Sequence, residues 1–226
     1  AGLSDDNHVG SLPIGFSFPF YENQYDEFYI QSNGLIGFDN LYIVPENRWI
    51  PNQDNQGGFY EHNFIAWLWS DLHPAIATGG TEVYYETVGD DLIVQFVNYR
   101  ACCDLNTGTV DAQVILSANG QIRFQYKQFT NMSVHGAVVG IENISGSDGL
   151  PVFPVFDGYG DYLHDELAVV IYPGEPEPSE PPEVELLYSL LDLFDANPDL
   201  SKIHVDDLPL FDLLAQLDLV EFNIDD

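Results

Sequence analysis

The sequence predicts an all-β fold, an antiparallel β-sandwich or jelly-roll-like domain with a short C-terminal helical tail. Short runs rich in β-branched and aromatic residues recur from residue 12 to about residue 173, and turns rich in glycine, asparagine and aspartate separate them. Such closely spaced short strands are typical of a sandwich or jelly roll. Beyond residue 184, leucines recur at helical spacing, and this change of period predicts the tail.

Each strand is expected where apolar residues alternate or run together between turn signals. Asn119-Gly120 marks the clearest hairpin, and a type I′ turn is expected there because this turn requires positive φ at both central residues. The expected strands are 14–20, 27–31, 35–38, 64–69, 82–86, 92–98, 110–116, 121–126, 137–141 and 167–172.

The chain is expected to have three parts. Residues 1–173 form the sandwich, and residues 174–183 form a Pro/Glu-rich linker that is extended and stiff. Residues 184–226 form an acidic amphipathic tail, with short helices expected over 184–195 and 207–218. Their apolar stripes are too small to fold alone, so the tail must dock on itself, on the sandwich or on another molecule.

The charge balance restricts the partners. The chain has 37 acidic and 5 basic residues, a formal net charge of −32. Such a surface repels the phosphates of nucleic acids and anionic lipids, so neither is expected as a partner. No stretch is long and apolar enough for membrane insertion. Cations, basic proteins and neutral glycans remain.

The sequence gives no support for catalysis. The six histidines are scattered, and none accompanies a nucleophile motif such as G-x-S-x-G. Some pair of carboxylates at glycosidase spacing is inevitable among 37 acids, so such a pair carries no information. The chain is therefore predicted not to be an enzyme.

Calcium is the expected cofactor, because three oxygen-rich clusters lie at strand ends or in loops. Asp71 directly follows a predicted strand, Asp157 and Asp161 flank a glycine-containing loop, and Asp5-Asp6 lie near the N-terminus. Carboxylates and carbonyls in flexible loops are the ligands that calcium prefers. Solvated turn acids are the alternative for each cluster.

The two cysteines are adjacent, at Cys102 and Cys103. A strained vicinal disulfide and a pair of reduced, partly buried thiols both stay open. Two cysteines supply neither a zinc cage nor a disulfide framework.

Several sequence blocks, in order, resemble the nidogen-like extracellular β domain and its bacterial surface-protein relatives. They are LPIGFSFPFY (12–21), FYIQSNGLIGF (28–38), FIAWLWSDL (64–72), GTEVYY (80–85), QVIL with NGQIRFQY (113–126) and GIEN (140–143). The resemblance covers about residues 10 to 172. The adjacent cysteines, an insert over 41–61 and the tail depart from that pattern.

The resemblance implies a secreted or cell-surface module of adhesion or matrix proteins, with no catalytic residues to carry over. Ala1-Gly2 would fit the mature end left after removal of a signal peptide. Asn131 and Asn143 begin glycosylation sequons, which matter only in a suitable secretory pathway.

Three functions stay open. The first is a non-enzymatic adhesion or matrix recognition module that binds an extracellular protein or glycan and is stabilised by calcium. The second is a structural subunit of an extracellular filament or surface layer, self-assembled through residues 184–226. The third is a carbohydrate-binding accessory module, with Trp49, Tyr42 and Tyr60 of the insert as rings that stack on sugar.

Overall fold

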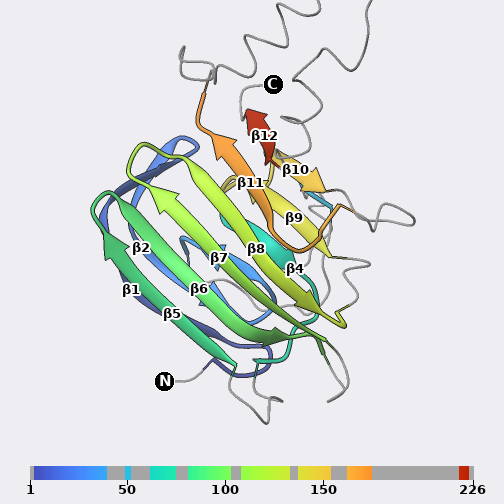
Figure 1. Cartoon of the computed structure of the whole chain (residues 1–226). Coiled ribbons are helices and arrows are strands. Elements are labelled where there is room, and N and C mark those ends of the chain that lie inside the picture. The colour runs from blue at the N-terminus through green and yellow to red at the C-terminus, as the bar shows by residue number, and fades with distance from the viewer. Residues whose placement is uncertain are drawn as a thin grey trace, which may run out of the picture.

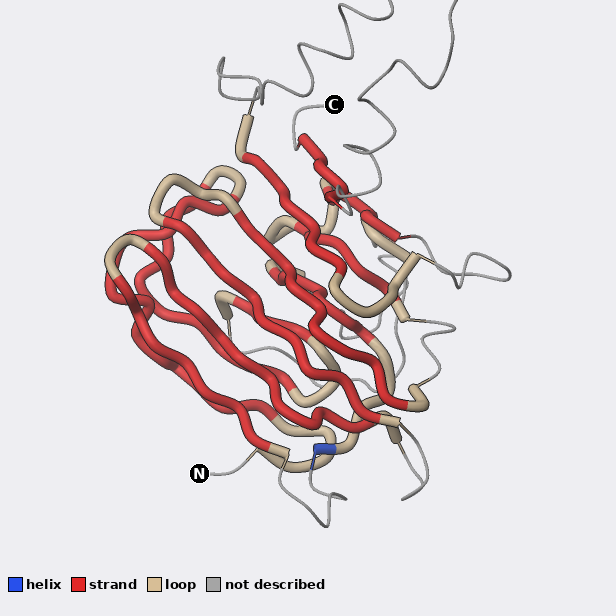
Figure 2. Tube along the Cα trace, in the orientation of Figure 1, coloured by secondary structure: helices blue, strands red, loops and turns tan. Residues whose placement is uncertain are grey.

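The computed structural model describes residues 3–39, 49–51, 62–74, 81–102, 108–132, 137–153, 162–174 and 219–223. These residues form two six-stranded sheets that lie against each other, as Figures 1 and 2 show. The first sheet has the order β1 (His8–Phe20), β2 (Asn23–Gln31), β3 (Leu35–Gly37), β4 (Phe64–Trp69), β9 (Val138–Glu142) and β10 (Gly149–Phe153). The second has the order β12 (Leu219–Asn223), β11 (Leu167–Tyr172), β8 (Ile122–Thr130), β7 (Thr109–Ser117), β6 (Asp91–Arg100) and β5 (Glu82–Val88).

The prediction of an all-β, antiparallel architecture is confirmed for the described residues, which contain no α-helix. The exception to antiparallel pairing is β12, which pairs with β11 in parallel. The tail helices expected over 184–195 and 207–218, and the linker beyond Gly174, lie outside the described residues. Residues 219–223 were assigned to the helical tail, and the structure places them in a strand instead.

The predicted hairpin at Asn119-Gly120 joins β7 to β8, but the expected type I′ turn is wrong. The amide of Gly120 donates to the carbonyl of Ser117 at 2.8 Å, so the central residues are Ala118 and Asn119. Gly120 has a φ of 93°, whereas Asn119 is not among the residues with positive φ. The turn therefore has a single left-handed residue, which follows its centre.

Aromatic residues fill the space between the sheets. Trp67 of β4 is fully buried and stacks on Phe96 of β6, with ring centroids 4.1 Å apart. Two buried tyrosines of the second sheet donate to backbone carbonyls of the first: Tyr99 to Ser32 at 2.8 Å, and Tyr126 to Trp67. Burial raises the pKa of both hydroxyls well above the usual value, so both remain donors at any physiological pH. These contacts fix how the two sheets lie against each other.

The outer face of the first sheet is also covered. All six residues of β4 are buried, so the strand packs on both sides. Its second side forms a separate apolar cluster, with Ile50 of the insert among its members: Leu35, Ile50, Phe64, Ala66, Trp69 and Val138. Part of the insert that was expected to carry ligand-stacking rings therefore covers this sheet.

Candidate functional site

Two of the three predicted calcium clusters meet at one end of the sandwich. Asp5 and Asp6 precede β1, and Asp71 follows β4. His73 Nε2 lies 3.3 Å from Asp5 Oδ2, and Asn33 Nδ2 donates to Asp6 Oδ1 at 3.0 Å. We call this group, Asp5, Asp6, Asp71, His73 and Asn33, the acidic end.

The backbone explains why these residues converge. Asn33 is fully buried in the turn between β2 and β3, and its Oδ1 accepts from the amide of Leu72 at 3.0 Å. Leu72 in turn forms a β-bridge with Ala101, and the amide of Cys102 donates to the carbonyl of Asp71 at 2.9 Å. Cys102 is disulfide-bonded, and Cys103 lies outside the described residues.

The acidic end concentrates negative charge. Burial raises the pKa of Asp71, and the neighbouring Asp6 and Asp5 raise it further, while His73 opposes the shift. Among the described residues, however, no group of three or more His, Cys, Asp or Glu side chains is arranged to hold a metal ion. Calcium binding at this end stays a prediction.

The acidic end makes a testable pH prediction. The folded-state pKa of Asp71 is raised, so the charged form of Asp71 destabilises the fold at neutral pH. This destabilisation disappears as the pH falls through the folded-state pKa towards the pKa of Asp71 in the unfolded chain. Asp71→Asn is therefore expected to raise stability at pH 7 by a few tenths to about 1 kcal/mol, the range of partly exposed charge pairs. The gain should shrink towards pH 4.

Thermal melting with millimolar calcium and with chelator separates repulsion from binding. If calcium binds here, it raises the melting temperature of the native chain by mass action and raises that of Asp71→Asn less. Identical melting of the native chain in both conditions would count against calcium. Asp148→Asn, in the turn between β9 and β10, serves as the control for a general charge effect.

Only some of the remaining predicted site residues are among those that the structure describes. Asp157, Asp161, Tyr42 and Tyr60 lie outside the described residues. Trp49 is 58% exposed.

Of the two sequons, Asn131 is exposed, whereas Asn143 is only 3% exposed. The Oδ1 atom of Asn143 accepts from the hydroxyl of Ser145 and from two backbone amides, so this side chain closes a turn. Glycosylation stays a prediction, and exposure favours Asn131.

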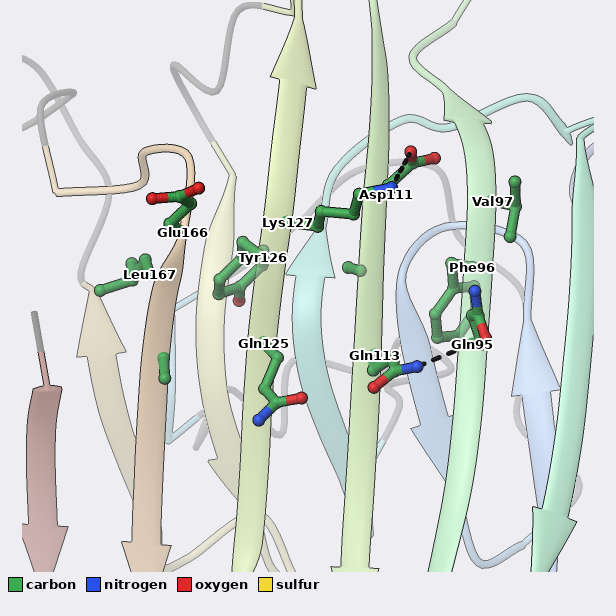
Figure 3. Close-up of a pocket in the computed structure, with 12 residues that line it drawn as sticks. Gln95, Phe96, Val97, Asp111, Gln113, Gln125, Tyr126, Lys127, Glu166 and Leu167 are labelled. Carbon is green, nitrogen blue, oxygen red and sulfur yellow. Dashed lines mark hydrogen bonds and ion pairs between the residues drawn. The ribbon is translucent and has the colours of Figure 1, made fainter.

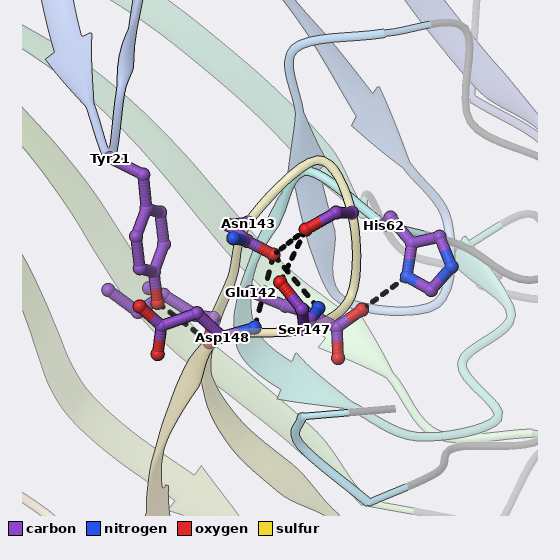
Figure 4. Close-up of polar contacts among 8 residues, drawn as sticks. Tyr21, His62, Glu142, Asn143, Ser147 and Asp148 are labelled. Carbon is purple, nitrogen blue, oxygen red and sulfur yellow. Dashed lines mark hydrogen bonds and ion pairs between the residues drawn. The ribbon is translucent and has the colours of Figure 1, made fainter. Parts of the chain in front are cut away.

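A second polar cluster was not singled out from the sequence. Glu142, at the end of β9, is fully buried, and its Oε1 lies 2.7 Å from His62 Nδ1 (Figure 4). Tyr21 lies on the other side of this strand end, and burial and the acids Asp148 and Glu142 raise its pKa. The signal available was the GIEN block, which placed an acid inside an apolar strand. The contact between Glu142 and His62 links the end of β9 to the segment just before β4, so we assign this cluster a structural role.

The outer face of the second sheet holds a third candidate, a groove of about 380 Å³ (Figure 3). Three glutamines on neighbouring strands form a row across it: Gln95 of β6, Gln113 of β7 and Gln125 of β8 are register partners. Gln113 Nε2 donates to Gln95 Oε1 at 3.3 Å. We call this surface the glutamine groove; its lining residues include Gln95, Gln113, Gln125, Asp111, Lys127 and Glu166.

The charges around the glutamine groove largely compensate one another. Lys127 Nζ lies 4.0 Å from Asp111 Oδ2, and Arg123 Nη2 donates to Asp91 Oδ2 at 3.0 Å. Arg123 and Lys127 are two of the chain's five basic residues, and both lie on β8. Among the residues that line the groove, Lys127 is basic and Asp111 and Glu166 are acidic, so the lining carries one net negative charge on a chain whose net charge is −32. The three glutamines add amide donors and acceptors.

Comparison with known proteins agrees with this architecture. A family model described as NIDO related matches residues 1–152, about two thirds of the chain. No curated protein and no solved structure matches the chain. Among the residues that the structure describes, no helix has the length and hydropathy needed to cross a membrane. The match and the order of the strand blocks show that the chain belongs to the NIDO-related family, whose domains are typically extracellular.

Proposed function

We propose that the chain is a secreted, non-enzymatic recognition module of the adhesion or matrix type, and that it binds a neutral glycan in the glutamine groove. The observation that carries this proposal is the row of Gln95, Gln113 and Gln125 across three strands. The family supports an extracellular matrix-type module. The groove supplies the surface with which such a module would contact its ligand.

The two outer faces of the sandwich differ in a way that favours this surface. The first sheet buries Leu35, Phe64 and Trp69 beneath Ile50, so its outer side carries an apolar cluster. The outer face of the second sheet instead presents Gln95 and Gln125 as exposed side chains. Binding residues on a rigid sheet lose little conformational freedom when a ligand orders them, which favours affinity.

The chemistry of the groove fits hydroxyl groups. Each glutamine offers one carbonyl acceptor and two amide donors, and sugar hydroxyls both donate and accept. A neutral ligand avoids the repulsion that an anionic one meets on this chain. Buried polar groups left unpaired by a wrong ligand cost about 1–3 kcal/mol each, so a row of amides also gives specificity.

Binding to an array of neutral oligosaccharides built from glucose, mannose, galactose and N-acetylglucosamine tests the proposal. The native chain is expected to bind a subset of them. Gln113→Ala removes the central amide of the row, and we expect affinity for that subset to fall by about tenfold or more, which corresponds to the loss of one or two hydrogen bonds.

Gln128→Ala is the matched control. Gln128 is an exposed glutamine of the same strand as Gln125, and it does not line the groove. Its substitution should leave the binding unchanged. No binding to any neutral glycan, or an equal loss for Gln113→Ala and Gln128→Ala, would refute recognition by the glutamine groove. Repeating the array in calcium and in chelator shows whether the acidic end contributes.

A further inference from the structure

The edges of the two sheets are protected unequally. β1 contains Pro13 and Pro19 and has two register shifts, and β10 contains Pro151 and one shift. The edge strand β5 carries Glu82 and Glu86. Prolines, irregular register and charges are the devices that prevent an edge from pairing with another strand.

β11 has none of these devices. Its sequence, LAVVIY, contains no charge and no proline, and its register with β8 runs from Leu167 to Ile171 without a shift. Val169 and Ile171 are fully buried. Left uncovered, this strand would present unpaired backbone groups on an apolar edge, which is a template for adding a strand.

The strand that covers this edge comes from the far end of the chain. β12 pairs with β11 in parallel over five residues, from Ala168 opposite Leu219 to Tyr172 opposite Asn223 (Figure 1). The sequence of β12 alternates, and the register sets Val220 beside Val169 and Phe222 beside Ile171. The sequence of β12 includes Glu221, whereas that of β11 contains no charged residue.

No hairpin joins β12 to β11, because the two strands are parallel. Residues 173–218 separate the two strands. At full extension a chain of that length reaches at most about 150 Å. The radius of gyration expected for a folded domain of this size is about 15 Å, so chain length does not prevent β12 from reaching a second copy.

We propose that the β11 edge is a strand-exchange site. There, β12 of a second copy of this chain takes the place of the first copy's own β12. The same backbone hydrogen bonds form in either arrangement, so exchange is controlled by concentration. Self-capture dominates in dilute solution, because a tether gives an effective concentration in the millimolar range. Reciprocal exchange closes a dimer, and one-way exchange propagates a chain of copies.

Mixing two full-length variants, each with one cysteine added to the native Cys102 and Cys103, tests the exchange. Ala168→Cys is prepared with natural isotopes and Leu219→Cys with ¹⁵N. The two variants are unfolded together, refolded at about 1 mM and oxidised. This concentration is comparable with the effective concentration of a tethered β12. These positions are register partners, whereas neither variant can close this bridge alone. Mass spectrometry of the digest identifies peptides that join position 168 of one copy to position 219 of the other, and separates them from exchange with Cys102.

Glu86→Cys mixed with Leu219→Cys is the control, because Glu86 lies on β5, the opposite edge of the same sheet. Exchange predicts about tenfold more 168–219 bridges than 86–219 bridges, since a disulfide needs Cα atoms within about 7 Å. Equal yields overturn the proposal. The proposal is also overturned if the double variant, Ala168→Cys with Leu219→Cys, forms the 168–219 bridge within monomers while the mixture of the two single variants forms none. If neither the double variant nor the mixture forms the bridge, β12 does not pair with β11, and the proposal is overturned as well.

Discussion

The free energy of unfolding of Gly34→Ala is expected to fall by more than about 3 kcal/mol, a large part of the stability of a domain. Gly34 has a φ of 85°, which costs any other residue about 1–3 kcal/mol. A Cβ atom at this position would also lie 2.0 Å from the carbonyl oxygen of Leu68, a backbone atom that cannot move aside alone. The carbonyl of Gly34 accepts from the amide of Trp67 at 3.1 Å, so displacing the turn also breaks this link to β4.

Urea denaturation of Gly34→Ala beside Gly89→Ala measures this effect. Gly89 also has a positive φ, of 63°, but no atom lies within 4 Å of the position that its Cβ would take. Its substitution should cost only the conformational part, about 1 kcal/mol. Equal losses for the two variants would mean that the close approach of the 32–34 turn to β4 is wrong. The acidic end would then lose its basis as well, because Asn33 is part of that turn.

Trp67→Ala is expected to cost about 3–5 kcal/mol, the usual range for removing a large buried aromatic side chain. The indole is fully buried, stacks on Phe96 and meets Tyr99 edge-on, with ring centroids 5.7 Å apart. Its removal leaves a cavity between the sheets that a rigid sandwich fills poorly. The substitution therefore tests the packing that fixes the two sheets against each other.

The matched control is Trp49→Ala, since Trp49 is 58% exposed. We expect its free energy of unfolding to change by less than about 1 kcal/mol. Calorimetry suits this comparison, because both substitutions alter the fluorescence signal. A small loss for Trp67→Ala, similar to that for Trp49→Ala, would contradict the position of Trp67 at the centre of the core.

The strands that were predicted correctly have strong local signals. Residues 64–69 and 167–172 are apolar runs bounded by polar turns, and between residues 12 and 173 no helical period competes with them. β10 was missed because Pro151 interrupts its pattern, and a proline is tolerated there only because the strand lies at a sheet edge. β12 was missed because its pairing with β11 spans more than 40 residues of chain, and no local signal reports such a contact.

The candidate sites could be predicted only in part. Asp5, Asp6 and Asp71 were identified as acids, but their convergence depends on buried Asn33, whose role is set by tertiary contacts. The observed hairpin is symmetric about Asn119 and sets Gln113 opposite Gln125, whereas the predicted two-residue turn at Asn119-Gly120 would set Gln113 opposite Tyr126. Gln95 joins the row through the register of β6 with β7, which shifts between Phe96 and Tyr99. The pairing of Gln95 with Gln113 is set by how the strands pack, so the spacing of these residues in the sequence does not predict it.

The measurement that tests the proposed function most directly is a titration followed by NMR, in which the side-chain amides of the glutamines are observed. The array oligosaccharide that binds best is added to the native, ¹⁵N-labelled chain. We predict that the side-chain Nε2 resonances of Gln95, Gln113 and Gln125 shift together and saturate with one dissociation constant, while that of Gln128 stays in place. Saturating shifts confined to residues outside the glutamine groove, with these three resonances unmoved, would contradict the account.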